Sequence, residues 1–153
     1  MTPPPARSTQ QRIQDTVHRL ENDVDAWIAS ADPSTGTPYL VPLSFHWDGA
    51  AVIVATPPAS VTGRNLSSSG RARVGVGTTR DVVLIEGVVT DITPADEIAP
   101  EAGDIFAERS GFDPRVLSTP YAYYRIEARR IQAWREVNEL DGRELMRGGR
   151  WVG

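Results

Sequence analysis

The chain contains 153 residues with a formal net charge of −4, and its 40% hydrophobic and 24% charged residues are typical of one globular domain. The acidic balance argues against general nucleic-acid binding, which needs a basic surface, and the absence of cysteine excludes disulfides and thiolate metal sites. No apolar run approaches the ~18 residues of a membrane-spanning helix and residues 1–7 lack a secretory signal, so we expect a cytoplasmic protein with no membrane or nucleic-acid partner.

The first third of the chain predicts a tail, a helix and three strands. Residues 1–9 are rich in proline and polar residues, which indicates a flexible tail. A helix is expected from about residue 10 to 22, with Ser8 or Thr9 as its N-cap. Strands are expected over residues 25–31, 38–47 and 50–56. The Asp48-Gly49 step between the last two predicts a tight hairpin turn, because glycine accepts positive φ without steric cost.

A short capped helix is predicted in the middle of the chain. Ser60 is its candidate N-cap and the helix is expected to end before Gly70. A strand over Arg71–Thr78 follows, in which Gly75 and Gly77 leave room for another group to approach closely. A valine-rich strand is then predicted over residues 81–90.

The last third predicts an acidic helix from Thr93-Pro94 to about Arg109, a short irregular piece and a long strand over residues 121–137. We expect the domain to span residues 10–137, with residues 138–153 as a C-terminal extension. About six strands joined mostly by short turns, without strand-helix-strand alternation, indicate a mainly β fold: an antiparallel barrel with peripheral helices.

Arg64 and Asn65 form the first candidate site, because they lie just past a strand end where a helix begins. The start of a helix favours anions, and an arginine can make a two-pronged contact with a phosphate or carboxylate. The hydroxyl groups of Thr56, Ser60 and Thr62 would add donors. The alternatives are a surface arginine beside an ordinary helix cap, and an asparagine that braces the loop.

Several segments resemble a known family when they are taken in order. They are residues 26–30, Leu40–Gly49, Arg64–Leu66 with Arg71–Val74, and Asp81–Gly87. In this order and spacing the chain resembles the pyridoxamine 5'-phosphate oxidase-like, FMN-binding split-barrel family. The likeness is greatest to its actinobacterial branch, which includes deazaflavin (coenzyme F-420) dependent reductases. The resemblance implies a six-stranded antiparallel split barrel that forms a homodimer, with two equivalent sites at the subunit interface.

The resemblance also implies a cofactor-binding region. The cofactor phosphate would lie at the end of the third strand and the loop after it, where family members often carry a basic pair. Here the matching positions are Val61, Thr62 and Gly63, so that Arg64 alone keeps the charge.

Two further groups of residues follow from the same resemblance. Pro42, Leu43 and Ser44 match strand positions whose backbone lines a flat ring, although plain strand packing would also account for them. A proline inside a strand further indicates a sheet edge, a bulge or a ligand-facing stretch. Trp134 and Arg135, at the end of the last strand, are expected to reach the neighbouring subunit's site, with a core tryptophan as the alternative.

No catalytic residue or metal ligand is predicted. His18 and His46 are the only histidines, and no familiar nucleophile motif is present. This pattern fits an enzyme whose bound cofactor supplies the chemistry. We therefore expect coenzyme F-420 or FMN as cofactor and hydride transfer to a small organic substrate. The alternatives are a non-catalytic barrel that binds a cofactor or small anion and, disfavoured by acids among the C-terminal arginines, an RNA-binding barrel.

Overall fold

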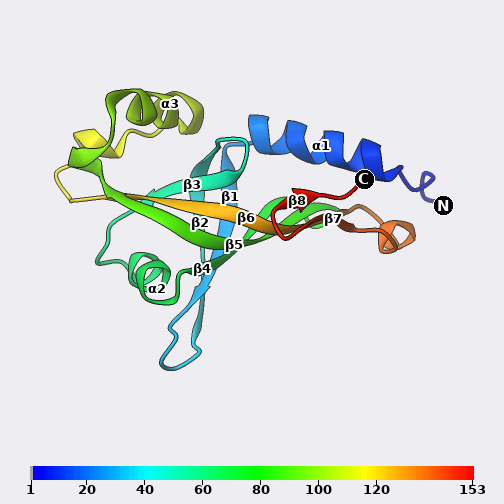
Figure 1. Ribbon diagram of the computed structural model, residues 1–153, viewed down its shortest axis with the longest axis horizontal. Helices are drawn as coiled ribbons and strands as arrows, with labels where there is room; N and C mark the ends of the chain where they lie inside the picture. The colour runs from blue at the N-terminus through cyan, green and yellow to red at the C-terminus, as the bar shows by residue number, and fades with distance from the viewer. Residues whose placement is uncertain (1) are drawn as a thin grey trace.

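The computed structural model describes residues 2–153 and shows a six-stranded antiparallel barrel with helices packed around it (Figure 1). The barrel strands are β1 (Asp25–Ala31), β2 (Pro38–Trp47), β3 (Ala51–Thr56), β4 (Arg71–Thr78), β5 (Asp81–Pro94) and β6 (Ala122–Trp134). The helices are α1 (Thr9–Asn22), α2 (Val61–Ser69) and α3 (Pro100–Ser110). A terminal hairpin of β7 (Glu144–Arg147) and β8 (Arg150–Trp151) extends the sheet beyond β6.

The barrel closes because β6 has partners on both edges. The strands follow the order β3-β2-β1-β4-β5-β6, and β3 then pairs with β6, with Val54 opposite Tyr124. Alternate residues of each strand point inward, as Val74 and Val76 do in β4, whereas Arg71 and Arg73 face outward. The interior is filled by branched and aromatic side chains such as Phe45. The prediction of a mainly β, split-barrel fold is confirmed.

Local signals set the helix ends as expected. The Ser8 hydroxyl caps α1, and the Ser60 hydroxyl accepts a hydrogen bond from the Gly63 N–H at the start of α2. Gly70 ends α2 in the left-handed conformation, with φ of 68°. In Figure 1, α1 lies along one side of the barrel, while α2 and the β1–β2 hairpin lie on the opposite side.

The predicted acidic helix from Thr93 to Arg109 is wrong in its first half. Thr93 and Pro94 continue β5 and pair with Tyr123 and Ala122 of β6, so strand pairing holds this segment extended. A single 3-10 turn follows at Ala95–Glu97, and α3 begins only at Pro100. Proline suits this first helical position because its fixed φ is helical and its missing N–H would have no partner there.

The two ends of the described chain meet on one side of the barrel. Arg7 contacts the carboxylate of Glu139 through Nη2 at 2.7 Å, and the buried Arg12 donates to the carbonyl oxygens of Glu139 and Asp141. Leu145 of β7 is fully buried. Residues 138–153 are therefore packed against α1 and the barrel. Within residues 2–153, no helix has the length and apolarity needed to cross a membrane.

The close approach predicted at the glycines of β4 occurs at Gly77. Its φ is +92°, and the guanidinium of Arg19 occupies the space that a side chain would take. Arg19 Nη1 donates to the carbonyl oxygen of Asp81 at 2.6 Å. Gly75 has only an ordinary contact with Leu84. The group that approaches this strand is thus a side chain of α1.

Candidate functional site

A groove of about 760 Å³ lies between the β1–β2 loop and α2, and we call it the α2 groove. One side is formed by Asp32, Thr35, Thr37, Pro38 and Tyr39, and the other by Pro58, Val61, Arg64, Asn65, Ser67 and Ser68. Its volume is within the ~300–1,000 Å³ usual for sites that hold organic ligands. Arg64 is the single basic residue among those that line it.

The guanidinium of Arg64 has hydrogen-bond donors that its contacts in the described chain do not use. Its Nη1 donates to the carbonyl oxygen of Ala59 at 2.9 Å, and this is its one side-chain hydrogen bond within residues 2–153. A guanidinium carries five N–H donors, so several remain for a ligand. The N–H groups of Val61 and Thr62 precede the first intrahelical bond, from Arg64 to Ser60, and lie at the positive end of the helix dipole. This side of the groove favours an anion.

Asp32 brings a negative charge to the opposite side of the groove. Hydrogen bonds from Ser34, first from its hydroxyl and then from its backbone N–H, lower the pKa of this carboxyl, and the charge of Arg64 acts in the same direction. The carboxylate is therefore ionised at neutral pH. A bound anion would be attracted by Arg64 and would share the groove with the negative charge of Asp32.

The packing around Gly63 explains in part why the basic pair often found in the family is absent here. A Cβ atom at this position would overlap the carbonyl oxygen of Pro57 and lie 2.9 Å from the Cα of Pro58. Both neighbours are backbone, so neither can turn aside. The turn that leads into α2 therefore packs too closely for any side chain at position 63, and Arg64 is the next position at which a cation fits.

Asn65 lines the groove, but its side chain also joins two elements. The residue is buried, and Nδ2 donates to the hydroxyl of Ser30 in β1 at 3.2 Å. The bond holds α2 against β1 and is neither of the two roles foreseen from the sequence, ligand contact or local turn bonding. Its partner lies on a strand distant in the sequence, which no local pattern reveals.

Of the three hydroxyl residues in the β3–α2 segment, Thr56 and Ser60 contact one another, and Ser60 also bonds to the backbone. The Thr56 and Ser60 hydroxyl oxygens are 3.1 Å apart, and that of Ser60 donates to the Pro57 carbonyl at 2.7 Å. Thr62 is buried. None of the three is among the residues that line the groove. They shape the turn that presents Val61 and Arg64.

The predicted site residues of β2 lie further along the strand than the α2 groove. Pro42 is exposed and opposite Trp27 of β1, while β2 pairs with β3 only from Phe45 onward. Pro42 thus has a strand neighbour on one edge only, which is the edge position that a strand proline prefers. Leu43 is half-buried, and the Ser44 hydroxyl donates to Asp25 at 3.0 Å.

Trp134 and Arg135 lie at the far end of β6, beside α1 and the C-terminal segment. The guanidinium of Arg143 is 5.8 Å from the centre of the Trp134 ring. Arg135 contacts the carboxylate of Asp81 through Nε at 3.4 Å, and its backbone N–H donates to Glu139. Neither residue lines the α2 groove of its own chain, and their contact with a partner's site stays a prediction.

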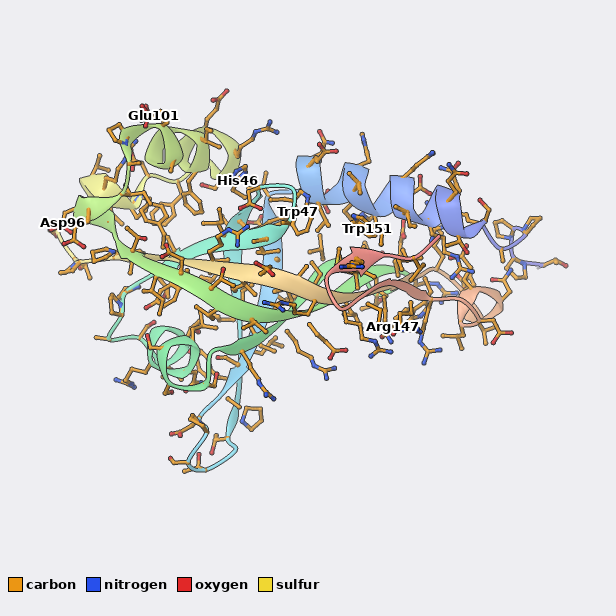
Figure 2. All side chains as sticks on the ribbon, viewed as in Figure 1. His46, Trp47, Asp96, Glu101, Arg147 and Trp151 are labelled. Carbon is orange, nitrogen blue, oxygen red and sulfur yellow. The ribbon has the colours of Figure 1, made fainter. Side chains whose placement is uncertain are left out.

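His46 lies apart from the groove, between the barrel and α3 (Figure 2). Burial lowers its pKa, and the nearby charge of Arg109 lowers it further, so the ring is neutral at pH 7. Across residues 2–153, no group of three or more acidic and histidine side chains is arranged to hold a metal ion.

The sequence did not single out one side of the groove. Asp32, Thr35, Thr37 and Tyr39 belong to a segment predicted only as a hairpin loop and the start of a strand. The exposed aromatic ring of Tyr39, directly after the loop, was the available signal. The place of Tyr39 in a groove becomes evident only in the fold, where α2 lies opposite this segment.

The chain belongs to the pyridoxamine 5'-phosphate oxidase family, whose sequence model matches residues 15–135. Among solved structures it is similar to an F420 reductase, with 18% identity, a TM-score of 0.61 and coverage of 74% of this chain and 93% of that one. A FAD-binding protein from Mesorhizobium loti is similar with 17% identity, a TM-score of 0.61 and coverage of 78% and 89%. A heme binding protein from Mycobacterium smegmatis has 14% identity, a TM-score of 0.63 and coverage of 94% and 59%.

At these identities the likeness to the solved structures establishes the fold. A search of curated proteins finds no match.

Proposed function

We propose that the protein binds coenzyme F-420 or FMN in the α2 groove and transfers hydride between the bound cofactor and a small organic substrate. The observation that carries this proposal is the guanidinium of Arg64, with unused donors, at the start of α2 and at the edge of a groove of ligand size. Similar structures that are described as an F420 reductase and a FAD-binding protein support the same class of ligand.

The residues of the groove fit a cofactor with a flat ring and a charged tail. Arg64 would hold the anionic group, with a contribution of ~1.5–3 kcal/mol for a charged hydrogen bond. The N–H of Val61 would add a donor, and Pro38 and Tyr39 offer apolar surface to a ring. Residues 39–60 contain no lysine or arginine that could hold the FMN phosphate, which favours the deazaflavin.

The bound ring would supply the hydride chemistry, and the chain would supply position and surroundings. Among the residues that line the groove, Asp32 and Arg64 are the acidic and the basic one, and Tyr39 is the one aromatic residue. Their role in this proposal is binding and orientation. The Ser30–Asn65 bond joins α2, which carries Arg64, to β1.

We propose further that the protein is a homodimer and that the outer face of β1, β2, β4 and β5 forms its interface. Trp27, Leu40 and Leu84 on this face are 52%, 61% and 40% exposed. The strand register aligns Trp27 with Gly75 and Gly75 with Leu84, so the side chains form one apolar patch. Arg73 and Glu86, of opposite charge, lie beside it on paired positions, an arrangement that a two-fold interface can match with itself.

A specific observation favours a second candidate function, a non-catalytic barrel that holds a cofactor or small anion. The groove carries one cation, with Asp32 on its opposite side, where the resemblance implies that family members often carry a basic pair. Weaker binding of the charged tail of the cofactor would suit a protein that stores or transfers this ligand.

Titration of the purified protein with F-420 and with FMN, followed by absorbance and fluorescence, tests binding. Steady-state assays with each reduced cofactor and a panel of small acceptors then separate the two functions. Turnover supports the oxidoreductase and excludes the carrier, while binding without turnover supports the carrier. Failure to bind either cofactor contradicts the assignment of the groove to a flavin or deazaflavin.

A further inference from the structure

A second groove, of about 650 Å³, lies on the other side of the β1–β2 loop. Its rim carries three arginines, Arg71 and Arg73 of β4 and Arg129 of β6, and we call it the arginine groove. Its lining also includes small residues of β1, such as Ala29 and Ala31. It shares Asp32 and Pro38 with the α2 groove, and its basic residues are all different.

Strand geometry brings the three arginines to one face. The alternation along β4 exposes Arg71 and Arg73 and buries Ala72 between them. In the β5–β6 ladder, Glu86 is opposite Arg130 but Gly87 is opposite Ala128, so Arg129 is the extra residue of a β-bulge. A bulge turns a side chain away from its regular direction. Arg129 follows the buried Ala128, is exposed, and lines the same groove as the two arginines of β4.

Three arginines and two carboxylates, those of Asp32 and Glu86, line this groove. Glu86 is 2.8 Å from Nη1 of Arg130 and 3.5 Å from Nη2 of Arg73, and Glu127 is 3.1 Å from Nη2 of Arg129. Glu127 is also 3.3 Å from Nη1 of Arg125, so the carboxylates of Glu86 and Glu127 are shared among four arginines.

Arg71 has no carboxylate within 4.0 Å anywhere in the described chain. Its ion-pairing capacity is unused, although the protein as a whole has a net charge of −4.

We propose that the arginine groove binds a small anion with two or more negative charges, such as a phosphate ester or a compound with several carboxylates. Guanidinium groups match both phosphate and carboxylate with paired hydrogen bonds. Arg73 lies beside the apolar patch of the proposed dimer interface, so Arg71, which has no acidic neighbour, and the exposed Arg129 would be the principal contacts. The site adjoins the α2 groove at Asp32 and Pro38, but its arginines are different and do not depend on the identity of the cofactor there.

Calorimetric titration with pyrophosphate and with citrate, at low ionic strength, tests the proposal. The two probes distinguish a preference for phosphate from a preference for carboxylate groups. We expect the protein to bind at least one of them, and Arg71→Gln and Arg129→Gln each to weaken that binding at least fivefold. Arg80→Gln is the matched control, because Arg80 is 78% exposed, lies in the β4–β5 turn and pairs with Glu136 at 2.8 Å. It should leave the affinity unchanged.

The results that would overturn the proposal are distinct from failure of cofactor binding. No binding of either probe, or equal losses in Arg80→Gln and Arg71→Gln, would reduce the groove to a diffuse positive surface. Sedimentation showing that Arg71→Gln or Arg129→Gln changes the oligomeric state would assign these arginines to a subunit interface instead. Arg64→Ala should bind the probes as the unaltered protein does, whatever it does to F-420 or FMN.

Discussion

Asn65 in α2 donates a hydrogen bond to Ser30 in β1, and both residues are buried. This bond joins the helix that carries Arg64 to the barrel. Loss of a buried hydrogen bond costs ~1–3 kcal/mol when one polar partner is left unsatisfied. We expect Asn65→Ala to lower the free energy of unfolding by about that amount, measured in urea.

A double-mutant cycle isolates the bond between Asn65 and Ser30. Ser30→Ala and Asn65→Ala should couple by ~1 kcal/mol, so that the double variant loses less stability than the two single variants together. Additive losses would show that Asn65 acts through packing alone.

Arg64→Ala should weaken binding of F-420, or of FMN, at least tenfold, because it removes the single cation of the groove. Fluorescence titration measures the change, and circular dichroism verifies that the variant is folded. Arg80→Ala removes an exposed arginine of similar size that lies elsewhere, and it should bind as the unaltered protein does. Unchanged affinity in Arg64→Ala would contradict the assignment of the charged tail to this residue.

The outer sheet face gives a prediction on assembly. Trp27→Glu places a charge in the centre of the exposed apolar patch and should convert the proposed dimer to a monomer, as sedimentation velocity would show. Val116→Glu is a suitable control, because Val116 is 77% exposed and lies in the segment after α3. A monomeric unaltered protein, or a dimer that tolerates Trp27→Glu, would remove this face from the interface.

Glu139 links stability to pH. Hydrogen bonds from Arg7 lower the pKa of Glu139 from 4.5 to about 2. A folded-state pKa below the ordinary one means that this carboxylate stabilises the fold fully above pH 4.5, and that the stabilisation is lost as pH falls from 4.5 toward 2.

We therefore expect Glu139→Gln to cost ~2–3 kcal/mol at pH 7, at the low end for a broken buried pair, because Arg7 keeps Asp15 at 3.0 Å. The difference from the unaltered protein should shrink below pH 4.5. Denaturant unfolding at pH 7, 4 and 3 measures it. A difference that stays constant over this range would show that the ion pair contributes nothing.

Gly63→Ala should destabilise the fold by ~1–3 kcal/mol, because the added methyl group would overlap the backbone of Pro57. Ser68→Ala, on the exposed side of the same helix, controls for the general effect of alanine in α2 and should change stability little. Thermal unfolding of the two variants makes the comparison. Equal stability would show that the turn before α2 can open to admit a side chain.

Local chemistry determined the elements that the sequence predicts well. Ser60 and Gly70 define both ends of α2 without help from the rest of the chain, and Gly49, with φ of 101°, makes the expected hairpin turn. The start of α3 was missed because pairing with β6 keeps Thr93 and Pro94 extended. That pairing joins segments separated by a helix, and no window of sequence contains it.

The candidate site divides in the same way. Arg64 was predicted from its position after a strand and a helix cap, both of which are local features. The role of Ser30 and the participation of Tyr39 depend on how β1 and β2 pack against α2. The three arginines of the second groove are spread over β4 and β6, and they meet because both strands pair with β5, which no local motif reveals.

The pairing of β3 with β6 also has a consequence for how the protein is made. Val52 of β3 pairs with Ile126 of β6. The outer edge of β3 therefore stays uncovered until β6, late in the sequence, has left the ribosome. Until then an apolar edge remains open to other nascent chains. Barrel closure should be the slow, late step of folding, and a chain interrupted before β6 should aggregate.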